Sequence, residues 1–347
     1  MKSYLYCDPR SLNDATNYYC GLIQKSLENQ GLSYSIVHRV SQIRNPAVIL
    51  TITEKYFVIA KFCFPQAKTI YWAQGVGAEE AKMDTGSIVS KIRYCFRRLA
   101  EPIATNHSDI LYCVSERMVL YYKEKYGLKD HGHILVMPCY NCSNHCQFDV
   151  EQYQAPVFAY AGNMGIWQSV DFMLDVYAII EANIPKAELK LFSANREEFD
   201  RMCKEKGIVN YSVSYVPIDV LPQELHKCKY GFIIRTSHIV NMVATPTKMN
   251  TYLAANLIPI YSDSIDAFKN INLGEFEIKA KCPLDAKKVA EQIIHFESVK
   301  HDYYKYEEIV NNAFLDYYND EKYLNLSDAL IGRLLASKKT RNCSSFR

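Results

Sequence analysis

The sequence has no strong excess of charge and no long apolar run. Lys and Arg number 40 and Asp and Glu 38 in 347 residues, a balance that excludes a strong general field for nucleic acid. No stretch approaches the roughly 18 uninterrupted apolar residues of a membrane-spanning helix. The N-terminus runs into a short apolar strand and lacks the charged region, apolar run and cleavage site of an export signal. We therefore expect a cytoplasmic protein.

The sequence is also poor in glycine and lacks a nucleotide fingerprint. Its 13 glycines include the pair in Gly162-Asn-Met-Gly165, a turn that lets backbone approach a ligand. The three-glycine dinucleotide motif is absent, and the next predicted strand ends in Phe192-Ser-Ala-Asn195, without the acidic residue that would bind a ribose. A nicotinamide enzyme is therefore not expected.

Cysteine is present without a clear disulfide or metal pattern. The 12 cysteines are spread through predicted core elements, as expected for free buried thiols in a reducing compartment. One cluster contains Cys139, Cys142, His145 and Cys146. Ligands packed this closely can hardly all reach one tetrahedral zinc ion, so we interpret the cluster as an interdomain connection, with zinc as the alternative.

Strand-like and helical runs alternate along the whole chain. The first half predicts strands at 3–7, 34–38, 48–51, 69–72, 110–113 and 134–137, with helices at 15–29, 54–62, 87–104 and 116–126. The second half predicts strands at 157–161, 189–192, 212–215, 230–234 and 257–261, with helices at 170–183, 197–206, 222–227, 286–296 and from 303. Continuous apolar strands of this kind form parallel sheets that are covered on both faces.

The alternation predicts an α/β protein with two tandem Rossmann-like domains facing an interdomain cleft. We place the first domain at 1–150, the second at 151–320, and a C-terminal helix with a basic tail at 321–347, which crosses back to the first domain. In open parallel sheets ligands bind beyond the carboxyl ends of the strands, so residues that follow strands carry the information about function.

The segment that begins Val243-Ala-Thr-Pro-Thr-Lys predicts an anion site. Thr245 is expected to cap a short helix and Pro246 to be its first residue, which leaves free N–H groups around Thr247 and Lys248 at the positive end of the helix dipole. Asn256 is suited to the left-handed conformation that ends a helix. An ordinary capped helix with an incidental lysine is the alternative.

Other strand ends contribute polar residues. Arg235 follows the strand at 230–234, and together with Gly162, Thr247 and Lys248 it would form a cradle for a diphosphate, unless it is a surface arginine in a salt bridge. Gln74 and the pair Glu79 and Glu80 are expected in a flexible loop above the first sheet, where they would bind an acceptor or supply a base. Solvated acids at a helix start are the alternative for the glutamates.

Several of these segments resemble glycosyltransferases of GT-B architecture, specifically the family-4-like transferases of bacterial capsule and surface-polysaccharide synthesis. Thr245-Pro-Thr-Lys-Met-Asn-Thr-Tyr-Leu-Ala-Ala-Asn-Leu-Ile-Pro-Ile is similar to the family's Ser-Pro-Thr-Lys, Glu-Tyr-Leu-Ala and Gly-Leu-Pro-Val segment. Tyr160-Ala-Gly-Asn-Met-Gly-Ile-Trp-Gln168 resembles its Tyr-x-Gly and Trp-Gln loop, and Tyr71-Trp-Ala-Gln-Gly75 its first-domain loop. Ser108-Asp-Ile-Leu-Tyr-Cys-Val-Ser-Glu116 and Met137-Pro-Cys match the close of the first domain.

The resemblance implies transfer of a sugar from a nucleotide-diphosphate donor, held by the second domain, to a glycan or polyprenyl-linked acceptor held by the first. It implies no obligatory metal and no cofactor, since the nucleotide sugar is a co-substrate. By position, Gly162, Asn163, Arg235, Thr247 and Lys248 would hold the diphosphate. Ser193, Val216 and Pro217 would contact the base and ribose, and Gln74, Glu79 and Thr251 would be catalytic.

The sequence departs from the family at two glutamates. Val243 and Thr251 stand where the family commonly has carboxylates that contact the hydroxyls of the donor sugar and ribose. A nucleotide-sugar epimerase of the same fold and a catalytically degenerate nucleotide-sugar-binding subunit therefore stay open as alternatives.

A membrane contact is the last expectation. In the helix at 88–103 an apolar stripe formed by Ile88, Ile92, Phe96, Leu99 and Ile103 faces away from Lys91, Arg97 and Arg98. We expect this stripe to pack on its own sheet; docking on anionic lipid at the inner face of the cell membrane is the alternative. The basic tail, with Arg333, Lys338, Lys339, Arg341 and Arg347, is either a disordered end or a second lipid contact.

Overall fold

The chain forms two compact units. The computed structural model describes residues 1–12, 14–83 and 87–343. The first unit contains Met1–Asn141, Val243–Thr245 and the chain from Asn319, and the second contains Cys142–Met242 and Pro246–Tyr318. The chain thus returns to the first unit for three residues between two parts of the second.

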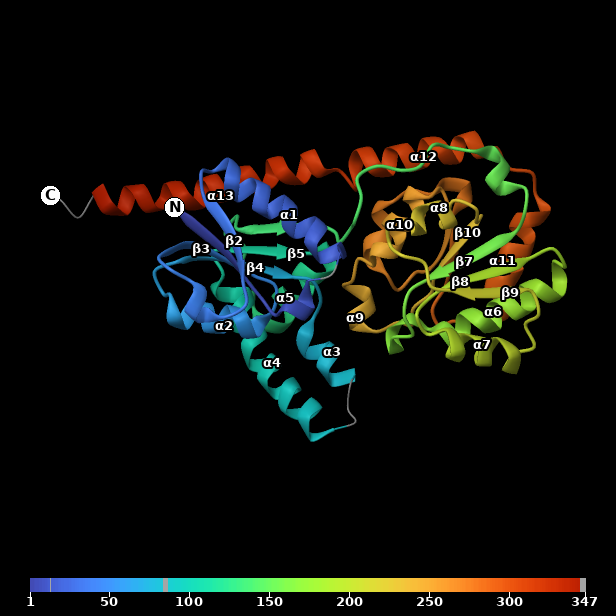
Figure 1. The fold of residues 1–347 in the computed structure, drawn as a ribbon, viewed down its shortest axis with the longest axis horizontal. Helices are drawn as coiled ribbons and strands as arrows, with labels where there is room; N and C mark the ends of the chain where they lie inside the picture. Colours follow the sequence, from blue (N-terminus) through green and yellow to red (C-terminus); the bar gives the residue numbers. More distant parts are fainter. Residues whose placement is uncertain (13, 84–86, 344–347) are drawn as a thin grey trace. The chain divides into compact units, whose positions relative to one another are not determined.

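The first unit is built on a parallel sheet of six strands, part of which is labelled in Figure 1. The order of the strands is β2-β1-β3-β4-β5-β6. Its strands are β1 (Lys2–Tyr6), β2 (Ser33–Val37), β3 (Pro46–Thr51), β4 (Lys68–Ala73), β5 (Ile110–Cys113) and β6 (Ile134–Val136). The central strands are mostly apolar because helices cover both faces of the sheet. All four residues of β5 are buried.

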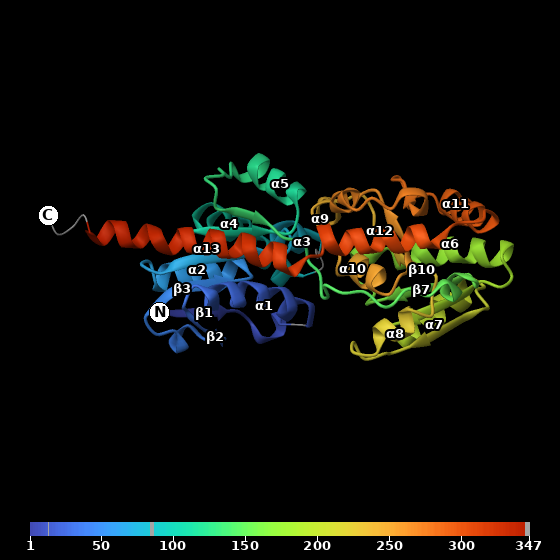
Figure 2. The ribbon, with the colours of Figure 1, turned by 90° about the horizontal axis from the view of Figure 1, so that it is seen from above.

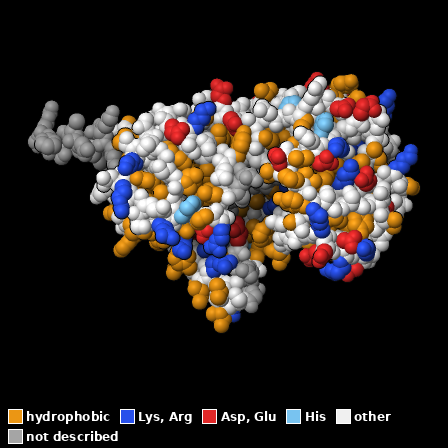
Figure 3. Space-filling model, in the orientation of Figure 1, with side chains coloured by type: hydrophobic (Ala, Val, Ile, Leu, Met, Phe, Trp, Pro, Cys, Tyr) orange, Lys and Arg blue, Asp and Glu red, His pale blue; other side chains and the backbone are white. Residues whose placement is uncertain are grey.

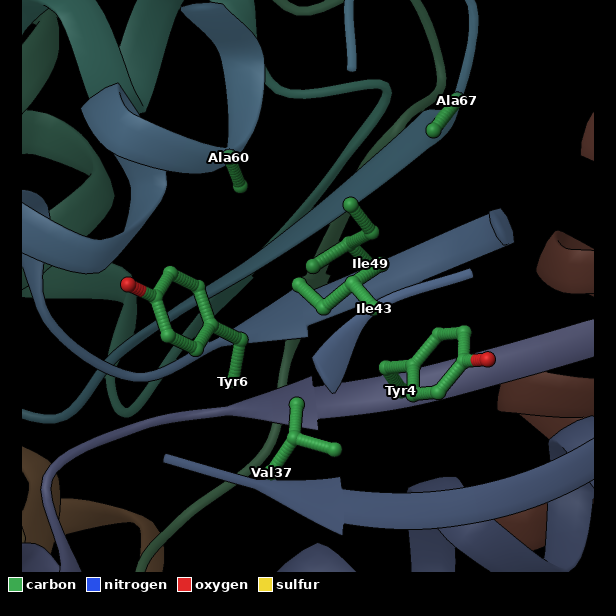
Figure 4. Close-up of a cluster of buried hydrophobic side chains, with 7 residues drawn as sticks. All are labelled: Tyr4, Tyr6, Val37, Ile43, Ile49, Ala60 and Ala67. Atoms are coloured by element: carbon green, nitrogen blue, oxygen red, sulfur yellow. The ribbon is translucent and has the colours of Figure 1, made fainter. Parts of the chain in front are cut away.

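Helices surround this sheet, and two of them come from opposite ends of the chain. The helices of the first unit are α1 (Asp14–Asn29), α2 (Glu54–Cys63), α3 (Gly77–Met83), α4 (Ile88–His107), α5 (Glu116–Tyr126) and α13 (Asp320–Cys343). α13 runs along α1 (Figure 2), where the Tyr18 hydroxyl donates a hydrogen bond of 2.8 Å to the Asp320 carboxylate. Part of the core lies between β1 and α2, where Tyr4, Tyr6, Ile43 and Ile49 pack around Ala60 (Figure 4).

The second unit is built on a parallel sheet in the order β12-β11-β10-β7-β8-β9. Its strands are β7 (Val157–Ala161), β8 (Glu188–Phe192), β9 (Tyr211–Ser214), β10 (Tyr230–Ile233), β11 (Ile258–Ser262) and β12 (Ile278–Ala280). This is the strand order of the Rossmann fold, in which the chain reverses its direction of travel between the first and fourth strands. Here those strands are β7 and β10.

Helices also surround the second sheet. They are α6 (Val170–Asn183), α7 (Arg196–Glu205), α8 (Leu221–Leu225), α9 (Ile239–Met242), α10 (Thr247–Ala254), α11 (Ala286–Ser298) and α12 (Tyr303–Asp316). Short 3₁₀ helices occur in both units at Pro9–Ser11, Val40–Gln42, Val150–Tyr153, Ile166–Gln168, Asp266–Asn270 and Gly274–Phe276.

The predicted α/β class and the two Rossmann-like sheets are confirmed. The sequence pattern did not predict α3, α9 or β12, each of which is only three to seven residues long. The expectation of a flexible loop at Gln74, Glu79 and Glu80 was wrong in part, because α3 begins at Gly77 and both glutamates lie in its first turn. Acids there favour a helix because they lie at the positive end of its dipole.

The expectation for the stripe on α4 was wrong. Ile88, Ile92 and Leu99 are 77%, 65% and 71% exposed. The buried face of α4 carries small and polar residues instead, namely Ser90, Ala100, Glu101, Ala104 and Thr105. Small residues permit close approach to α3 and α2, which are the main neighbours of α4. The stripe therefore points away from the unit.

Other expectations fall partly outside what is described. Lys338, Lys339 and Arg341 lie where α13 is described by its backbone only, and Arg347 lies outside the described residues. No disulfide joins the cysteines whose side chains are described, but Cys63 and Cys95 are exposed rather than buried. No helix in the described part of the chain is long and apolar enough to cross a membrane.

Glu101 is a buried carboxyl group in the core of the first unit. Burial, with the Glu54 charge nearby, raises the pKa of Glu101 from 4.5 to about 7 although the Tyr126 hydroxyl donates a hydrogen bond of 2.6 Å to it. The folded state therefore binds more protons than the unfolded state between these pH values, so this group lowers the free energy of unfolding as pH rises through that window.

We predict that Glu101→Gln flattens this dependence. The free energy of unfolding of the wild-type protein, relative to that of the variant, should fall between about pH 4.5 and 7, by about 3 kcal/mol at most. Urea unfolding at several pH values measures the difference. A difference that does not change with pH would show that Glu101 ionises normally in the folded protein.

Candidate functional site

Polar residues meet at the carboxyl edge of the second sheet. Gly162 directly follows β7, and Arg235 lies two residues beyond β10. β7 and β10 are neighbours in the sheet, and the chain's direction of travel reverses between them. Ligands of open α/β sheets bind in the crevice at this kind of reversal, so these residues define the candidate site.

The end of the Lys248 side chain lies close to Gly162. The φ of Gly162 is +153°, a conformation that other residues rarely adopt, and a Cβ atom at this position would lie 2.9 Å from Lys248 Nζ and Cε. Glycine therefore avoids backbone strain here and lets the lysine side chain approach. The Gly162 N–H donates a hydrogen bond of 3.0 Å to the carbonyl of Phe192, which fixes the loop over the end of β8.

The helix that carries Lys248 begins one residue later than expected. Pro246 is extended, with ψ of 124°, and α10 begins at Thr247. The expectation that Thr245 caps this helix was wrong, because the Thr245 hydroxyl accepts a hydrogen bond of 2.9 Å from the Cys139 N–H within the first unit. Thr247 and Lys248 are therefore the first two residues of α10, where backbone N–H groups lack partners inside the helix.

The end of α10 is as expected. Asn256 has φ of +58°. The Leu257 N–H donates to the carbonyl of Tyr252 at 2.9 Å, and the Asn256 N–H donates to that of Leu253 at 3.0 Å. These bonds form a Schellman motif, in which a left-handed residue satisfies the last helical carbonyls.

Tyr252 holds α10 against the sheet. Its hydroxyl accepts a hydrogen bond of 3.0 Å from the N–H of Ala161, the last residue of β7. Its ring lies against Gly231 of β10, so closely that a Cβ atom added to Gly231 would be 2.3 Å from the nearest ring carbon of Tyr252. The glycine in β10 thus permits α10 to lie close to the point at which the two strands end.

Lys248 is surrounded by neutral groups. Its ammonium donates a hydrogen bond of 2.7 Å to Gln168 Oε1 and lies 4.7 Å from the centre of the Tyr160 ring. The residue keeps some exposed surface, but the ammonium itself is packed among Gly162, Gln168 and Tyr160. Burial and the nearby charge of Arg235 both hold the pKa of Lys248 well below its usual value.

Arg235 is 8% exposed, and its guanidinium has few hydrogen-bond partners. Its guanidinium makes a long hydrogen bond of 3.4 Å to Asn241 Oδ1, and its Nε has no hydrogen-bond partner among the described residues. Burial lowers the pKa of Arg235 to about 10. Its backbone is fixed more firmly, because its N–H donates to the Ser262 hydroxyl at 2.7 Å.

Neither cation has a counter-ion within the described part of the chain. Among the described residues, no ion pair joins Arg235 or Lys248 to a carboxylate, and no carboxylate is among the groups that shift the pKa of either cation. Packing positive charge near a second cation without a partner costs free energy. An anion bound at this edge would remove that cost, since guanidinium and ammonium groups both hydrogen-bond phosphate.

Thr251, predicted to be catalytic, and Asn163, predicted to hold the diphosphate, both use their side chains in local hydrogen bonds. The Thr251 hydroxyl donates to the Thr247 carbonyl at 3.1 Å, one turn back in α10. The Asn163 side chain is turned to its own loop and accepts a hydrogen bond of 3.0 Å from the Gly165 N–H. The Asn163 carbonyl accepts from the Tyr160 hydroxyl at 2.6 Å.

The residues expected at the base and ribose follow the next strands of the sheet. Ser193 is buried directly after β8, and its hydroxyl accepts a hydrogen bond of 3.2 Å from the Asn195 N–H. Val216 and exposed Pro217 follow β9. The order β10-β7-β8-β9 therefore places Arg235, Gly162, Ser193 and Val216 in a row along one edge.

Solved structures share this two-unit architecture. The chain aligns with sucrose-phosphate synthase from Thermosynechococcus elongatus over 97% of its length and 100% of that protein, at 12% identity and a TM-score of 0.69. It aligns with WaaG, a glycosyltransferase involved in lipopolysaccharide biosynthesis, over 94% and 99%, at 10% identity and a TM-score of 0.67. HepE from Anabaena, solved in complex with UDP, aligns over 97% and 100%, at 12% identity and a TM-score of 0.62.

The chain has the GT-B fold. No family model and no curated protein matches it in sequence. The expected architecture is therefore confirmed at the level of the fold, and the roles of individual residues stay predictions.

Within the GT-B fold, Gln74 and Glu79 belong to the first unit. Gln74 follows β4, and its Oε1 accepts a hydrogen bond of 3.2 Å from the Tyr19 hydroxyl. Glu79 accepts hydrogen bonds from the Tyr121 hydroxyl at 3.0 Å and the Lys125 ammonium at 2.6 Å. Burial acts to raise the pKa of Glu79, but the Lys125 ammonium outweighs it and the pKa is lowered. A carboxylate held in this way is a weak base.

The cysteine cluster is used in packing. Cys139 belongs to the first unit and Cys142, His145 and Cys146 to the second. The Cys142 thiol donates to Asn250 Oδ1 at 3.2 Å, and the Cys146 N–H donates to the carbonyl of Ala254 at 2.6 Å, so the segment runs along α10. The described residues contain no group of three or more potential ligands arranged around a metal position.

Three residues at the site were not among the predicted ones. Tyr160 and Gln168 contact Lys248. They are the first and last residues of the segment that resembles the family's Tyr-x-Gly and Trp-Gln loop, so the resemblance carried a signal for them. Asn241 contacts Arg235 from α9, a four-residue helix without a recognisable pattern. No sequence signal identified it.

We predict that Lys248→Met stabilises the ligand-free protein. Removing a charge that is packed beside Arg235 should raise the free energy of unfolding by about 1 kcal/mol. Urea unfolding measures this change, and Lys204→Met, at an exposed ion pair on α7, is the matched control with an effect within about 0.5 kcal/mol. A loss of stability comparable to that of a core substitution would mean that Lys248 has a structural role.

Proposed function

We propose that this protein transfers a hexosyl group from a nucleotide-diphosphate sugar to a polysaccharide or lipid-linked oligosaccharide. The observation that carries the proposal is the pair of cations at the strand reversal of the second unit, Arg235 and Lys248, for which the described residues supply no counter-ion. The GT-B fold supports it, because the fold is shared with sucrose-phosphate synthase and with the glycosyltransferase WaaG.

In this proposal the donor's diphosphate binds near Gly162 and the start of α10. Lys248 and Arg235 supply positive charge, the backbone at Thr247 supplies N–H donors, and Gly162 leaves room for close approach. The nucleoside would then lie along the strand ends toward Ser193, Val216 and Pro217, with Asn163 in the loop above the phosphates. HepE binds UDP on the same fold, which agrees with a nucleoside diphosphate ligand.

The two cations also suit the chemistry of transfer. When the bond between the sugar and the diphosphate breaks, negative charge develops on the departing nucleotide. Fixed positive groups in a site with little water stabilise such charge strongly, because they need no reorganisation as the bond breaks. Arg235 and Lys248 would perform this role without a metal ion or a cofactor.

We assign the acceptor to surface-glycan synthesis in a bacterium, such as that of capsule. This assignment rests on the sequence resemblance to surface-polysaccharide transferases and on the likeness to WaaG. A polyprenyl-linked acceptor would place a cytoplasmic enzyme at the inner face of the cell membrane. Gln74 and Glu79, at the ends of elements in the first unit, are the residues we propose for contact with the acceptor and the transferred sugar.

A nucleotide-sugar-binding subunit without turnover is the second candidate. The observation that favours it is that Thr251 and Val243, which stand where the family has glutamates, supply no carboxylate. Thr251 donates its hydroxyl to a helical carbonyl. Val243 is fully buried in the first unit, where its carbonyl accepts a hydrogen bond of 2.6 Å from the Ser115 hydroxyl.

We predict that nucleoside diphosphates bind and stabilise the protein. A diphosphate at a hundred times its dissociation constant should add about 2.7 kcal/mol and raise the melting temperature by several degrees, more than the matching monophosphate does. Lys248→Ala should remove most of this shift, and Lys204→Ala should leave it unchanged. Differential scanning fluorimetry over a panel of nucleotides measures it; no shift with any nucleotide in the wild-type protein would contradict the proposal.

We predict that Arg235→Gln lowers the rate of transfer more than it weakens donor binding. A fixed charge that stabilises the departing diphosphate should be worth about a hundredfold in kcat. Release of nucleotide from labelled donors over a panel of glycan and polyprenyl-linked acceptors gives the rate, and calorimetry gives the donor affinity. A loss of donor affinity with kcat unchanged would assign Arg235 to binding alone.

Two other outcomes would replace the proposal. Tight donor binding without turnover on any acceptor would favour the binding subunit. Interconversion of nucleotide sugars in the absence of an acceptor would identify an epimerase.

A further inference from the structure

An exposed apolar stripe lies on α4 of the first unit. Figure 3 shows hydrophobic side chains gathered on the part of the molecule where α4 projects, with Lys and Arg side chains beside them. The stripe consists of Ile88, Val89, Ile92, Phe96, Leu99 and Ile103, which are between 40% and 77% exposed. A contiguous apolar patch of this kind marks an interaction surface.

The positions of these residues give the stripe its shape. At about 100° per residue they fall within a sector of about 100° on the helix, and Ile88 and Ile103 lie about 22 Å apart along the axis. Ser90, Glu101 and Ala104 occupy the opposite, buried side. The stripe is therefore straight, narrow and directed outward.

Basic residues flank the stripe. On the same helical projection Lys91 and Arg98 border one side and Arg93 borders the other, and all three are exposed. Arg97 points the other way, since its guanidinium donates to the Gly77 carbonyl at 3.0 Å. Glu101 is the one acidic residue in α4 and is fully buried. The outward face thus combines apolar residues with positive charge.

We propose that this face of α4 docks on an anionic lipid bilayer. Helices that lie in the membrane interface have this pattern, because the apolar stripe enters the boundary of the acyl chains while flanking cations meet negative headgroups. A second copy of the chain fits less well, because a symmetric contact would bring the flanking cations of both copies together. The contact deepens the proposed function by naming the surface that would bring a lipid-linked acceptor to the enzyme.

The test is binding of the full-length protein to sucrose-loaded vesicles without donor or acceptor. We expect the protein to sediment with vesicles of phosphatidylcholine and phosphatidylglycerol, and to do so much less with phosphatidylcholine alone or at high salt. Leu99→Asp should lower the partition coefficient at least tenfold, and Lys91→Ala with Arg98→Ala on the order of tenfold. Leu326→Asp, at a leucine 47% exposed on α13 of the same unit, is the matched control and should change little.

A second readout locates the contact. Phe96→Trp, made in a Trp167→Phe background, leaves buried Trp72 as the other tryptophan. Its emission should shift to shorter wavelength with anionic vesicles and be quenched by brominated lipid.

Several outcomes would overturn the proposal. These are equal binding of wild type and Leu99→Asp, equal loss of binding in Leu326→Asp, or binding that does not depend on lipid charge. A solution dimer that Leu99→Asp dissociates, without vesicle binding, would assign the face to a second copy. A protein that does not bind vesicles can still show the nucleotide-dependent shifts in melting temperature, and a protein without those shifts can still bind vesicles. The two proposals are therefore tested separately.

Discussion

The second unit packs two positive charges for which the described residues supply no counter-ion. Arg235 and Lys248 lie where β7 and β10 end, and the surrounding elements are adapted to hold them there. Gly162 leaves room for the lysine, Gly231 and Tyr252 bring α10 close to the sheet, and Ser262 fixes the backbone of Arg235. An anion bound as we propose would find these charges already in place and would remove their electrostatic cost.

The sequence predicted the elements well because both sheets are parallel and covered on two faces. Strands such as β5 and β10 are apolar at every position, and helices with regular caps, such as α5 after Ser115, separate them. The order of strands could not be derived in the same way, since it depends on contacts between distant segments. It is this order that places Arg235 beside Gly162 rather than elsewhere along the edge.

The errors have one common cause, which is that a local pattern does not identify its partner. Thr245 has the residue type and position of a helix cap, but its hydroxyl is taken by the Cys139 N–H, 106 residues away. The stripe on α4 has the periodicity of a buried face, but Ala100 and Ala104 on the other side permit closer packing against neighbouring helices. Amphipathic spacing shows that a helix has two faces and does not show which one the protein covers.

The two units thus depart from ordinary burial in opposite ways. The second unit buries charge that it leaves unpaired, and the first exposes apolar surface that it leaves uncovered. Neither arrangement favours folding of the isolated protein, since buried charge loses its hydration and exposed isoleucine and leucine gain nothing from folding. Both are consistent with surfaces completed by something outside the chain, an anion in one unit and a lipid surface in the other. A sugar donor that is a diphosphate and an acceptor that is anchored in lipid would supply these two chemistries.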